Sequence, residues 1–391
     1  MKYEPFKLER YFAEHEFSVG KQLSGSDCEA ISLNTLFELF TYDEKKEFMN
    51  MPLKYTESNG SFRLREEIAR LYHGFSPDEI FVAAPEECIF LTLNSFLEKG
   101  DRIIVLHPVY QSLSDIPKAA GCEVIHWSLK NREGKWEADL DFLEDMIGKN
   151  IKALLINFPH NPTGFMPSPE QYSAIVELAE KNNVFVFSDE MYWLLEHEYR
   201  EPLPPFCTLY ENSVSLFGMS KSFGLPGLRI GWLGTKNRKL YSSVSHLKDY
   251  TTICSSAPSE ELARIALRHK DYFISRSRDI IRNNIDYASG VFEDIDHILQ
   301  WNQPSGSSVA FPCFKGKVSS SKIAEDLVRN MDLLMLPGAL YNYDDRYFRL
   351  GFGRKIFKDA LYALKKYLEA AYERGGASGL KLYYTDYEGN A

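Results

Sequence analysis

The sequence predicts an α/β protein with a mostly parallel central sheet, helices on both faces of that sheet, and a smaller α+β domain. Short apolar runs alternate with amphipathic stretches through the middle of the chain. The runs are apolar almost without interruption, which is typical of parallel strands buried on both faces. The expected strands cover residues 78–84, 101–108, 123–129, 151–159, 183–190, 213–220 and 227–234.

The segments between and after these strands predict helices and a second domain. Residues 169–183, PEQYSAIVELAEKNN, have a helical pattern that ends on asparagines suited to a C-cap, and 240–285 is helical again. Short strands are then expected at 307–314, 332–338 and 346–353, followed by an amphipathic helix near 356–373. We therefore expect a large domain of residues 49–285, a small domain of residues 1–48 and 286–373, and a C-terminal tail of residues 374–391.

The composition is that of a soluble globular protein with a full core. Of the 391 residues, 44% are hydrophobic and 26% are charged. The formal net charge of −10 argues against nucleic acid or an anionic membrane as the main partner, because both attract a basic surface.

Cysteine usage and the N-terminal segment predict a cytoplasmic location. The six cysteines are scattered singly, without a C-x-x-C pair or zinc spacing, which favours free thiols in a reducing compartment. The first residues, MKYEPFKLERYFAEHEF, lack the apolar core of a signal peptide. The sequence has no apolar run near the ~18 residues that span a bilayer.

Candidate binding residues follow the expected strands, because ligands of such sheets bind beyond the carboxyl ends of the strands. Asp189 ends a wholly apolar strand and could face a ligand cation or cap a helix. Tyr110 could stack on a flat ligand or fill the core. Asn161, in the turn 161–164, could aim its amide across the strand end or belong to an ordinary loop.

Lys221 is unusual because it lies in an apolar stretch, SLFGMSK (215–221). Apolar surroundings disfavour the ammonium form, so the pKa of the amine falls and the amine becomes nucleophilic. Such a lysine is suited to forming an imine with an aldehyde, and a salt-bridged core lysine is the alternative. Arg229 could hold a phosphate with its planar guanidinium, and the turn 84–87 could do so with backbone N–H groups.

Taken together, these residues fit pyridoxal phosphate. This cofactor needs an amine, a carboxylate at the pyridinium nitrogen, a face for the ring and donors for the phosphate. Lys221, Asp189, Tyr110 and Arg229 match those needs in kind. The sequence lacks the glycine fingerprints of dinucleotide and nucleotide-triphosphate sites.

Several motifs then resemble those of the class I/II aminotransferases, which are fold-type-I pyridoxal-phosphate enzymes. SKSFGLPGLRIGW is similar to the family's lysine signature, HNPTG to its Asn-Pro-x-Gly turn, and SDEMY to its Asp-x-x-Tyr. YTESNGSFRLREEIA, PSGSSVAFPCF, LPGALY and RYFRLGFG resemble further segments of these enzymes. The collinear match runs from about residue 50 to about residue 355.

The resemblance implies a role for each residue around the cofactor ring. Lys221 would form the internal imine and then move the proton between Cα and C4′. Asp189 would pair with the pyridine nitrogen, and Tyr110 would stack on the ring. Tyr192 and Asn161 would hydrogen-bond the phenolic oxygen.

It also implies how the phosphate and the substrate are held. The phosphate would contact Ser220, Arg229 and the backbone amides around Glu86 and Glu87. Tyr55 would reach the phosphate of the neighbouring subunit, which implies a homodimer with shared active sites. Arg349 would bind the substrate α-carboxylate, together with Asn161.

Two departures from the family pattern affect the phosphate site. Gly218 stands where family members usually carry a hydroxyl, and residues 84–87 read Ala-Pro-Glu-Glu where they often have Gly and Ser/Thr. Because carboxylates repel a phosphate, we expect the side chains of Glu86 and Glu87 to point away from it.

The leading functional prediction is a transaminase that exchanges an amino group between an amino acid and a 2-oxo acid. The alternative is an enzyme of the same fold that catalyses elimination, cyclisation or oxidation. FKLERYFAEHEF and SGSDCEAISLNTLFEL resemble capreomycidine-synthase-like members, which act on arginine derivatives. Asp27 and Glu29 could meet a cationic side chain or be solvated surface. A non-catalytic ligand-binding protein of this fold is a third hypothesis, which the combination of lysine, aspartate and arginine disfavours.

Overall fold

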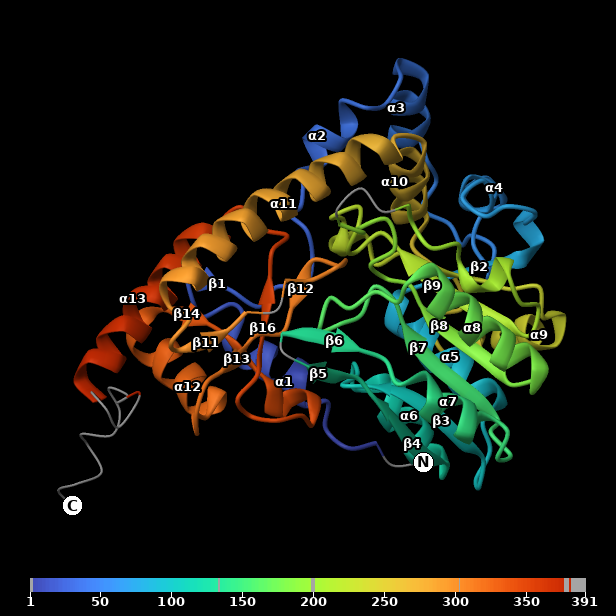
Figure 1. Ribbon diagram of the computed structural model, residues 1–391. Helices are drawn as coiled ribbons and strands as arrows, with labels where there is room; N and C mark the ends of the chain where they lie inside the picture. Colours follow the sequence, from blue (N-terminus) through green and yellow to red (C-terminus); the bar gives the residue numbers. More distant parts are fainter. Residues whose placement is uncertain (1–2, 133, 198–200, 302, 376–379, 381–391) are drawn as a thin grey trace.

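A seven-stranded sheet forms the centre of the larger part of the molecule in the computed structural model (Figure 1). The structure describes residues 3–132, 134–197, 201–301, 303–375 and 380. The strand order is β2-β10-β9-β8-β7-β3-β4, and within this sheet only β10 runs antiparallel to its neighbours. The strands are β2 (Ile80–Ala83), β3 (Arg102–His107), β4 (Glu123–Ser128), β7 (Ala153–Asn157), β8 (Phe185–Asp189), β9 (Ser213–Gly218) and β10 (Gly231–Gly234). The predicted α/β class with a mostly parallel sheet is confirmed.

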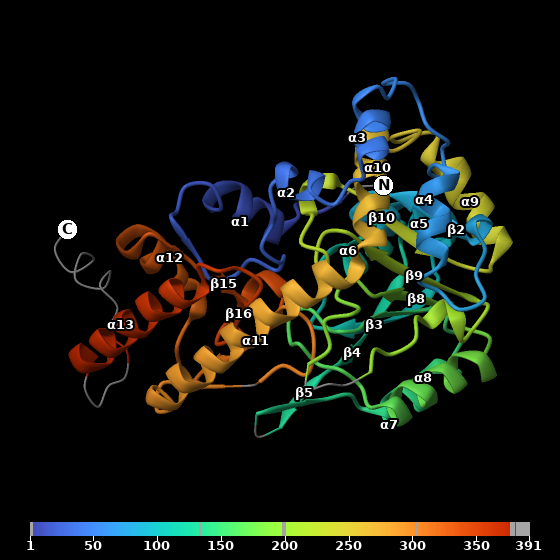
Figure 2. The same ribbon diagram turned by 90° about the horizontal axis from the view of Figure 1, so that it is seen from above.

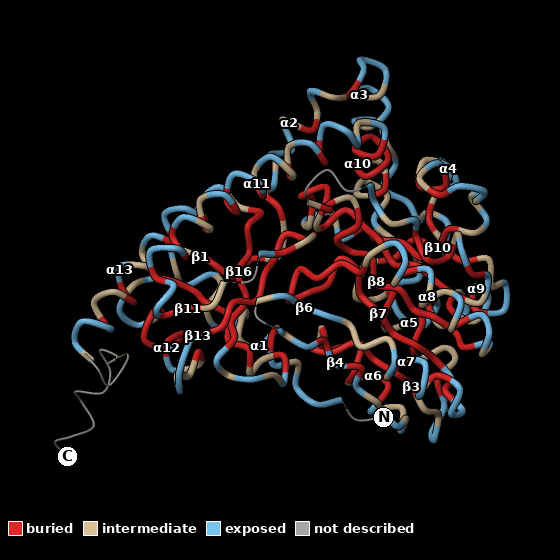
Figure 3. The backbone as a smooth tube through the Cα atoms, viewed as in Figure 1, coloured by how far each residue is buried: buried red, intermediate tan, exposed pale blue. Residues whose placement is uncertain are grey.

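Helices cover both faces of this sheet, which explains why its strands are apolar throughout. In β3, Ile103 and Val105 pack in one core cluster with side chains of α5, α6 and α9, whereas Ile104 and Leu106 pack in another with α7 and α8. Successive side chains of a strand point to opposite faces, so β3 is buried from Ile103 to His107, and only its first residue, Arg102, is partly exposed. The neighbouring strands β7 and β8 are buried along their whole length (Figure 3). The helices are α5 (Pro85–Phe96), α6 (Ser112–Ala120), α7 (Leu140–Ile147), α8 (Pro169–Lys181) and α9 (Arg238–Lys248).

The remaining strands form small sheets that join distant parts of the chain. β1 (Lys21–Gln22) pairs with β14 (Leu333–Leu334), and β16 (Phe348–Gly351) lies between β12 (Val309–Ala310) and β15 (Leu336–Pro337). β11 (Leu299–Gln300) pairs with β13 (Cys313–Phe314), and β5 (Lys130–Arg132) with β6 (Lys135–Glu137). The strands expected after residue 306 are therefore present but shorter than the apolar runs.

Long helices flank these small sheets. The 25-residue α11 (Lys270–Asp294) extends from α10 (Ala257–Arg268) past α13 (Phe357–Gly375), as both views of the ribbon show (Figures 1 and 2). α12 (Ser320–Met331) and α1 (Lys7–His15) lie in the same part, while α2 (Leu33–Phe37), α3 (Tyr42–Met49) and α4 (Phe62–Ala69) complete the helices. Most of the expected tail, 374–391, lies outside the described residues. Among the described helices, none is long and apolar enough to cross a membrane.

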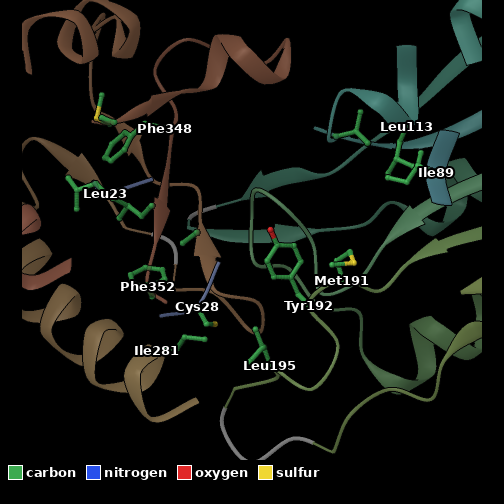
Figure 4. Close-up of a cluster of buried hydrophobic side chains, with 14 of the residues drawn as sticks. Leu23, Cys28, Ile89, Leu113, Met191, Tyr192, Leu195, Ile281, Phe348 and Phe352 are labelled. Atoms are coloured by element: carbon green, nitrogen blue, oxygen red, sulfur yellow. The ribbon is translucent and has the colours of Figure 1, made fainter. Parts of the chain in front are cut away.

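The N-terminal segment packs directly against β16. The N–H of Gly351 donates to the carbonyl of Leu23 at 2.7 Å, and a Cβ at Gly351 would lie only 1.7 Å from the carbonyl oxygen of Gly25. Figure 4 shows Leu23, Phe348 and Phe352 of this junction on one side and Ile89, Leu113 and Met191 on the other, with Tyr192 between them. Gly351 thus allows the close approach that brings residues 23–27 to the centre of the molecule.

Replacing Gly351 with alanine should therefore destabilise the protein. The added methyl group must displace backbone, and overpacking of this kind costs about 1–3 kcal/mol. Gly290→Ala in α11 is the control, because a Cβ there meets no atom within 4 Å and alanine favours the helix. Thermal unfolding followed by circular dichroism would measure both variants. Equal melting temperatures for the two would contradict this account of the junction.

Candidate active site

A cavity of about 520 Å³ opens at the carboxyl ends of β8 and β9, between the central sheet and β16. This is where the parallel-sheet rule places a ligand. Its lining includes nine of the candidate residues: Glu86, Tyr110, Asn161, Asp189, Tyr192, Ser220, Lys221, Arg229 and Arg349. Glu87 and Tyr55 are not part of this lining, and the Tyr55 side chain is 82% exposed.

Lys221 follows β9 and reaches into the cavity from the turn that ends this strand. Its Nζ donates to Ser26 Oγ at 2.7 Å and lies 6.0 Å from the centre of the Tyr192 ring. Among the described residues, no carboxylate pairs with this amine, so the alternative of a salt-bridged lysine is not observed. Burial lowers the pKa of Lys221, and Arg349 adds to this effect against Asp27 and Glu9. A larger fraction of the amine is therefore uncharged and nucleophilic than in an exposed lysine.

Asp189 ends β8 with its carboxyl group in the cavity lining. Its Oδ1 accepts the N–H of Met191 at 3.0 Å, and turn residues follow, so it does not cap a helix. Burial raises the pKa of Asp189 to about 6, while the Met191 hydrogen bond and Lys221 oppose that rise. A cation in the cavity would stabilise the ionised form of this buried carboxyl group.

Arg349 is held at the other side of the cavity by three neutral acceptors. Its Nε and one terminal nitrogen donate to the Ser24 carbonyl at 3.1 and 2.7 Å. The other terminal nitrogen donates to Tyr341 Oη at 2.5 Å and to Asn161 Oδ1 at 3.3 Å. The Tyr341 hydroxyl donates to the same Asn161 oxygen at 3.0 Å. Within the described part of the chain this guanidinium, 2% exposed, meets no carboxylate, so a carboxylate ligand could provide its counter-charge.

Aromatic side chains form two walls of the cavity. Tyr192 is 2% exposed, and burial raises the pKa of its hydroxyl far above the usual value. Tyr110 lies between the cavity and Phe6, with ring centres 5.2 Å apart, and donates its hydroxyl to Glu9 at 2.7 Å. Tyr110 therefore packs against α1 and also lines the cavity. Filling the core and stacking on a flat ligand, the two roles expected for it, are thus compatible.

The third side of the cavity is formed by the N-terminus of α5 and the turn 220–229. Ser220 Oγ is buried and meets no hydrogen-bond partner among the described residues. Arg229 is exposed and donates to the Pro226 carbonyl at 3.0 Å. Its φ is +55°, so Arg229 does not belong to the strand expected at 227–234, and β10 starts only at Gly231. An orphaned buried hydroxyl beside free helix N–H groups fits an anionic ligand.

The two glutamates of this turn behave differently. Glu87 points away from the cavity, as expected, and its carboxylate accepts hydrogen bonds from Thr251 and Thr252 at 2.5 and 2.8 Å. Glu86 lies in the cavity lining, within hydrogen-bond distance of Ser112 Oγ at 3.4 Å. For Glu86, the expectation of a side chain turned away from the cavity is therefore not supported.

Several residues of the site carry no sequence signal of their own. Glu9, Phe12 and Glu16 reach the cavity from α1 and the residue after it. Arg354 arrives from the segment after β16 and forms a bidentate pair with Asp27 at 2.8 and 3.0 Å. Amphipathic patterning locates α1 but does not tell which of its polar side chains face a ligand. Among the described residues, no cluster of His, Cys, Asp or Glu is arranged to hold a metal ion.

Comparison with known proteins identifies the class of enzyme. The model of the family "Aminotransferase class I and II" matches residues 44–355. The chain therefore belongs to this family, which confirms the motif resemblance, and it is an enzyme of the transaminase class.

Individual relatives cover most of the chain. Capreomycidine synthase of Streptomyces vinaceus is 27% identical over 354 residues, covering 88% of each protein. The aspartate aminotransferase of Thermotoga maritima is 27% identical, covering 81% of this chain and 82% of that protein. A solved PLP-dependent aminotransferase from Streptococcus suis 89-1591 superposes with a TM-score of 0.88 at 28% identity, covering 95% of this chain and 99% of its own. The PLP-dependent cyclase OrfR superposes with a TM-score of 0.85 at 27% identity, covering 94% and 98%.

Proposed function

We propose that this protein is a pyridoxal-phosphate-dependent aminotransferase in which Lys221 moves the proton at the substrate Cα. The proposal rests on three groups that meet in one cavity: an amine and a guanidinium that have no carboxylate partner in the described part of the chain, and a buried carboxyl group. They are Lys221, Arg349 and Asp189. The reaction would exchange an amino group between an amino acid and a 2-oxo acid.

The cavity residues fit pyridoxal phosphate. When bound, this cofactor supplies an electron sink that acidifies the Cα–H of an attached amino acid. Asp189 would keep the ring nitrogen protonated, and that contact would favour ionisation of its own carboxyl group. The orphaned hydroxyl of Ser220, the guanidinium of Arg229 and the first N–H groups of α5 would hold the phosphate.

Arg349 and Asn161 would orient the substrate. The Arg349 guanidinium is fixed by Ser24 and Tyr341, so a substrate carboxylate would meet a cation that does not need to reorganise. A fixed carboxylate also fixes which Cα bond faces Lys221. Because the Lys221 amine is held by Ser26 and its pKa is lowered, it is suited to accept a proton from Cα and return it.

Lys221→Ala should abolish both cofactor attachment and transamination. Borohydride reduction of the loaded wild type, followed by peptide mass spectrometry, should find the pyridoxyl group on Lys221, and turnover should give 2-oxo acid and amino acid in equal amounts. Removal of the base lowers the rate by at least about 100-fold. The matched control is Lys239→Ala, an exposed lysine far from the cavity. A variant without Lys221 that kept its cofactor attachment and rate would contradict the proposal.

A second candidate is an enzyme of the same fold that cyclises, eliminates from or oxidises an amino acid with a cationic side chain. The acidic wall of the cavity, formed by Glu9, Glu16 and Asp27, favours it. Glu16 and Asp27 share the guanidinium of Arg354, whereas Glu9 accepts the hydroxyl of Tyr110. Burial raises the pKa of Glu16, so a ligand cation would relieve an unfavourable charge there. Relatives named capreomycidine synthase and cyclase are consistent with such a reaction. Glu29 is outside the cavity lining and accepts the N–H of Lys355 at 3.0 Å.

Arginine and its neutral isostere citrulline distinguish a cationic from a neutral substrate preference. If the acidic wall selects a cation, kcat/KM for arginine should exceed that for citrulline by about 10-fold or more, and Glu16→Gln should remove this difference. Release of ammonia or uptake of oxygen, without an equal yield of 2-oxo acid, would favour the second candidate. Equal use of arginine and citrulline by wild type and variant would exclude a role of the acidic wall in selection.

We further propose a homodimer with shared active sites, in which Tyr55 reaches the partner's phosphate. Several large apolar side chains are exposed to solvent on the single chain: Tyr42, Leu53, Tyr55 and Tyr250 are each more than 80% exposed. Sedimentation equilibrium would measure the mass of the species in solution.

A cytoplasmic location is proposed because all six cysteines are free. The division into domains at residues 49–285 and at 1–48 with 286–373 is kept as a proposal.

A further inference from the structure

The N-terminus of α5 offers fewer donors to an anion than a helix start of this kind normally provides. Pro85, its first residue, has no N–H, and Ala84 before it has no capping side chain. The N–H of Cys88 is already bonded to the Ala84 carbonyl at 2.9 Å. The N–H groups of Glu86 and Glu87 are therefore the backbone donors left at this end of the helix.

A hydroxyl cannot be supplied from position 218 either. A Cβ on Gly218 would lie 2.9 Å from Gly231 Cα and 3.0 Å from the Ile230 carbonyl oxygen. It would also lie 3.4 Å from Cγ of Pro85. Gly218 thus leaves the space next to Pro85 free of a side chain. Because Gly218 has no hydroxyl and Pro85 has no N–H, two hydrogen-bond donors are missing from the phosphate side of the cavity. Among the described residues that line the cavity, Ser220 has a buried hydroxyl without a hydrogen-bond partner.

The Glu86 carboxyl group lies beside these free donors, in the cavity lining. Of the groups around it, Ser112 Oγ of α6 is within hydrogen-bond distance, at 3.4 Å. The charged groups that face it are Glu9 from α1, Asp189 from β8 and Arg229 from the turn 220–229. Glu87, the next residue, is instead bonded to Thr251 and Thr252 and pairs with Lys248 at 3.6 Å.

An ionised Glu86 would repel a phosphate at this site, whereas a protonated one could bind it. Two negative groups that share a site raise the pKa of one of them, and a carboxylic acid O–H donates a short, charge-assisted hydrogen bond to an anionic oxygen. On the basis of the proposed cofactor, we propose that Glu86 binds its phosphate as a neutral carboxylic acid and replaces the donors missing at Pro85 and Gly218. Loading of the cofactor is then coupled to protonation of this one side chain.

The pH dependence follows from the state of Glu86 before loading. Burial raises the pKa of Glu86 to about 7, Ser112 and Arg229 oppose this rise, and Glu9 and Asp189 add to it. Below that pH the group already carries its proton. Above that pH, Glu86 must take up a proton when the cofactor binds, so the affinity for the cofactor falls as the pH rises. Between about pH 6.5 and about pH 8.5, linkage to one such group weakens binding about 25-fold.

Binding of pyridoxamine 5′-phosphate to the cofactor-free protein tests this inference, because this form of the cofactor does not react with Lys221. Equilibrium dialysis at the two pH values would give the ratio of Kd values for the wild type, Glu86→Gln and the control Glu98→Gln, an exposed glutamate outside the cavity lining. The amide of Glu86→Gln donates a hydrogen bond at every pH, so its ratio should be about 25-fold smaller than that of the wild type. Glu98→Gln should keep the wild-type ratio.

The outcomes separate the inference from the proposed function. Equal ratios for the wild type and Glu86→Gln would overturn the role of Glu86 while leaving the cofactor assignment intact. If none of the three proteins bound pyridoxamine 5′-phosphate, both the role of Glu86 and the cofactor assignment would be overturned. Calorimetry at about pH 8.5 in two buffers of different ionisation enthalpy gives an independent measure. The wild type should take up about one proton more per bound cofactor than Glu86→Gln.

Discussion

The buried guanidinium of Arg349 is the interaction on which the rest of the site depends. It ties the N-terminal segment, through Ser24, to β16 and to the Asn161 turn that follows β7 of the central sheet. A buried charge is costly unless it is well hydrogen-bonded, and Arg349 meets this requirement with neutral acceptors only within the described chain. Arg349 is therefore a fixed positive charge that a substrate carboxylate could neutralise.

The charges around the cavity are arranged by region. Arg349 lies on the side of β16, Glu9, Glu16 and Asp27 of the N-terminal segment form another wall, and Ser220 and Arg229 lie beside the start of α5. Lys221 lies among these groups, bonded to Ser26 and with its pKa lowered by burial. An amine in that position can meet both a cofactor and a substrate.

The sequence reveals those parts of the site that directly follow buried strands. Asp189, Lys221 and Asn161 could be located because an apolar run ends immediately before each of them and parallel strands end at the same edge. The resemblance of RYFRLGFG to a family segment indicates Arg349. All of these residues line one cavity in the structure.

Other features depend on contacts between segments far apart in the chain. Tyr341 and Asn161 are 180 residues apart, and no local pattern predicts their hydrogen bond. The direction of the Glu86 side chain is decided by Ser112 and its neighbours, and helical periodicity does not define it. Arg229 has a left-handed backbone conformation just before β10. The apolar run around Arg229 continues into β10, so the sequence gives no sign of this turn. Strand ends are thus predictable from local sequence, whereas side-chain direction and N-terminal contributions require the folded chain.

The affinity of the pyridoxamine-phosphate form for a 2-oxo acid tests the central role of Arg349 most directly. Arg349→Gln should weaken this affinity by about 100-fold, because a charge-assisted bidentate contact is lost, and Arg349→Lys should weaken it by about 10-fold. Tyr341→Phe, which removes the hydroxyl bonded to the guanidinium, should have an intermediate effect, with circular dichroism showing that all variants are folded. An unchanged affinity for the 2-oxo acid in folded Arg349→Gln would contradict the account.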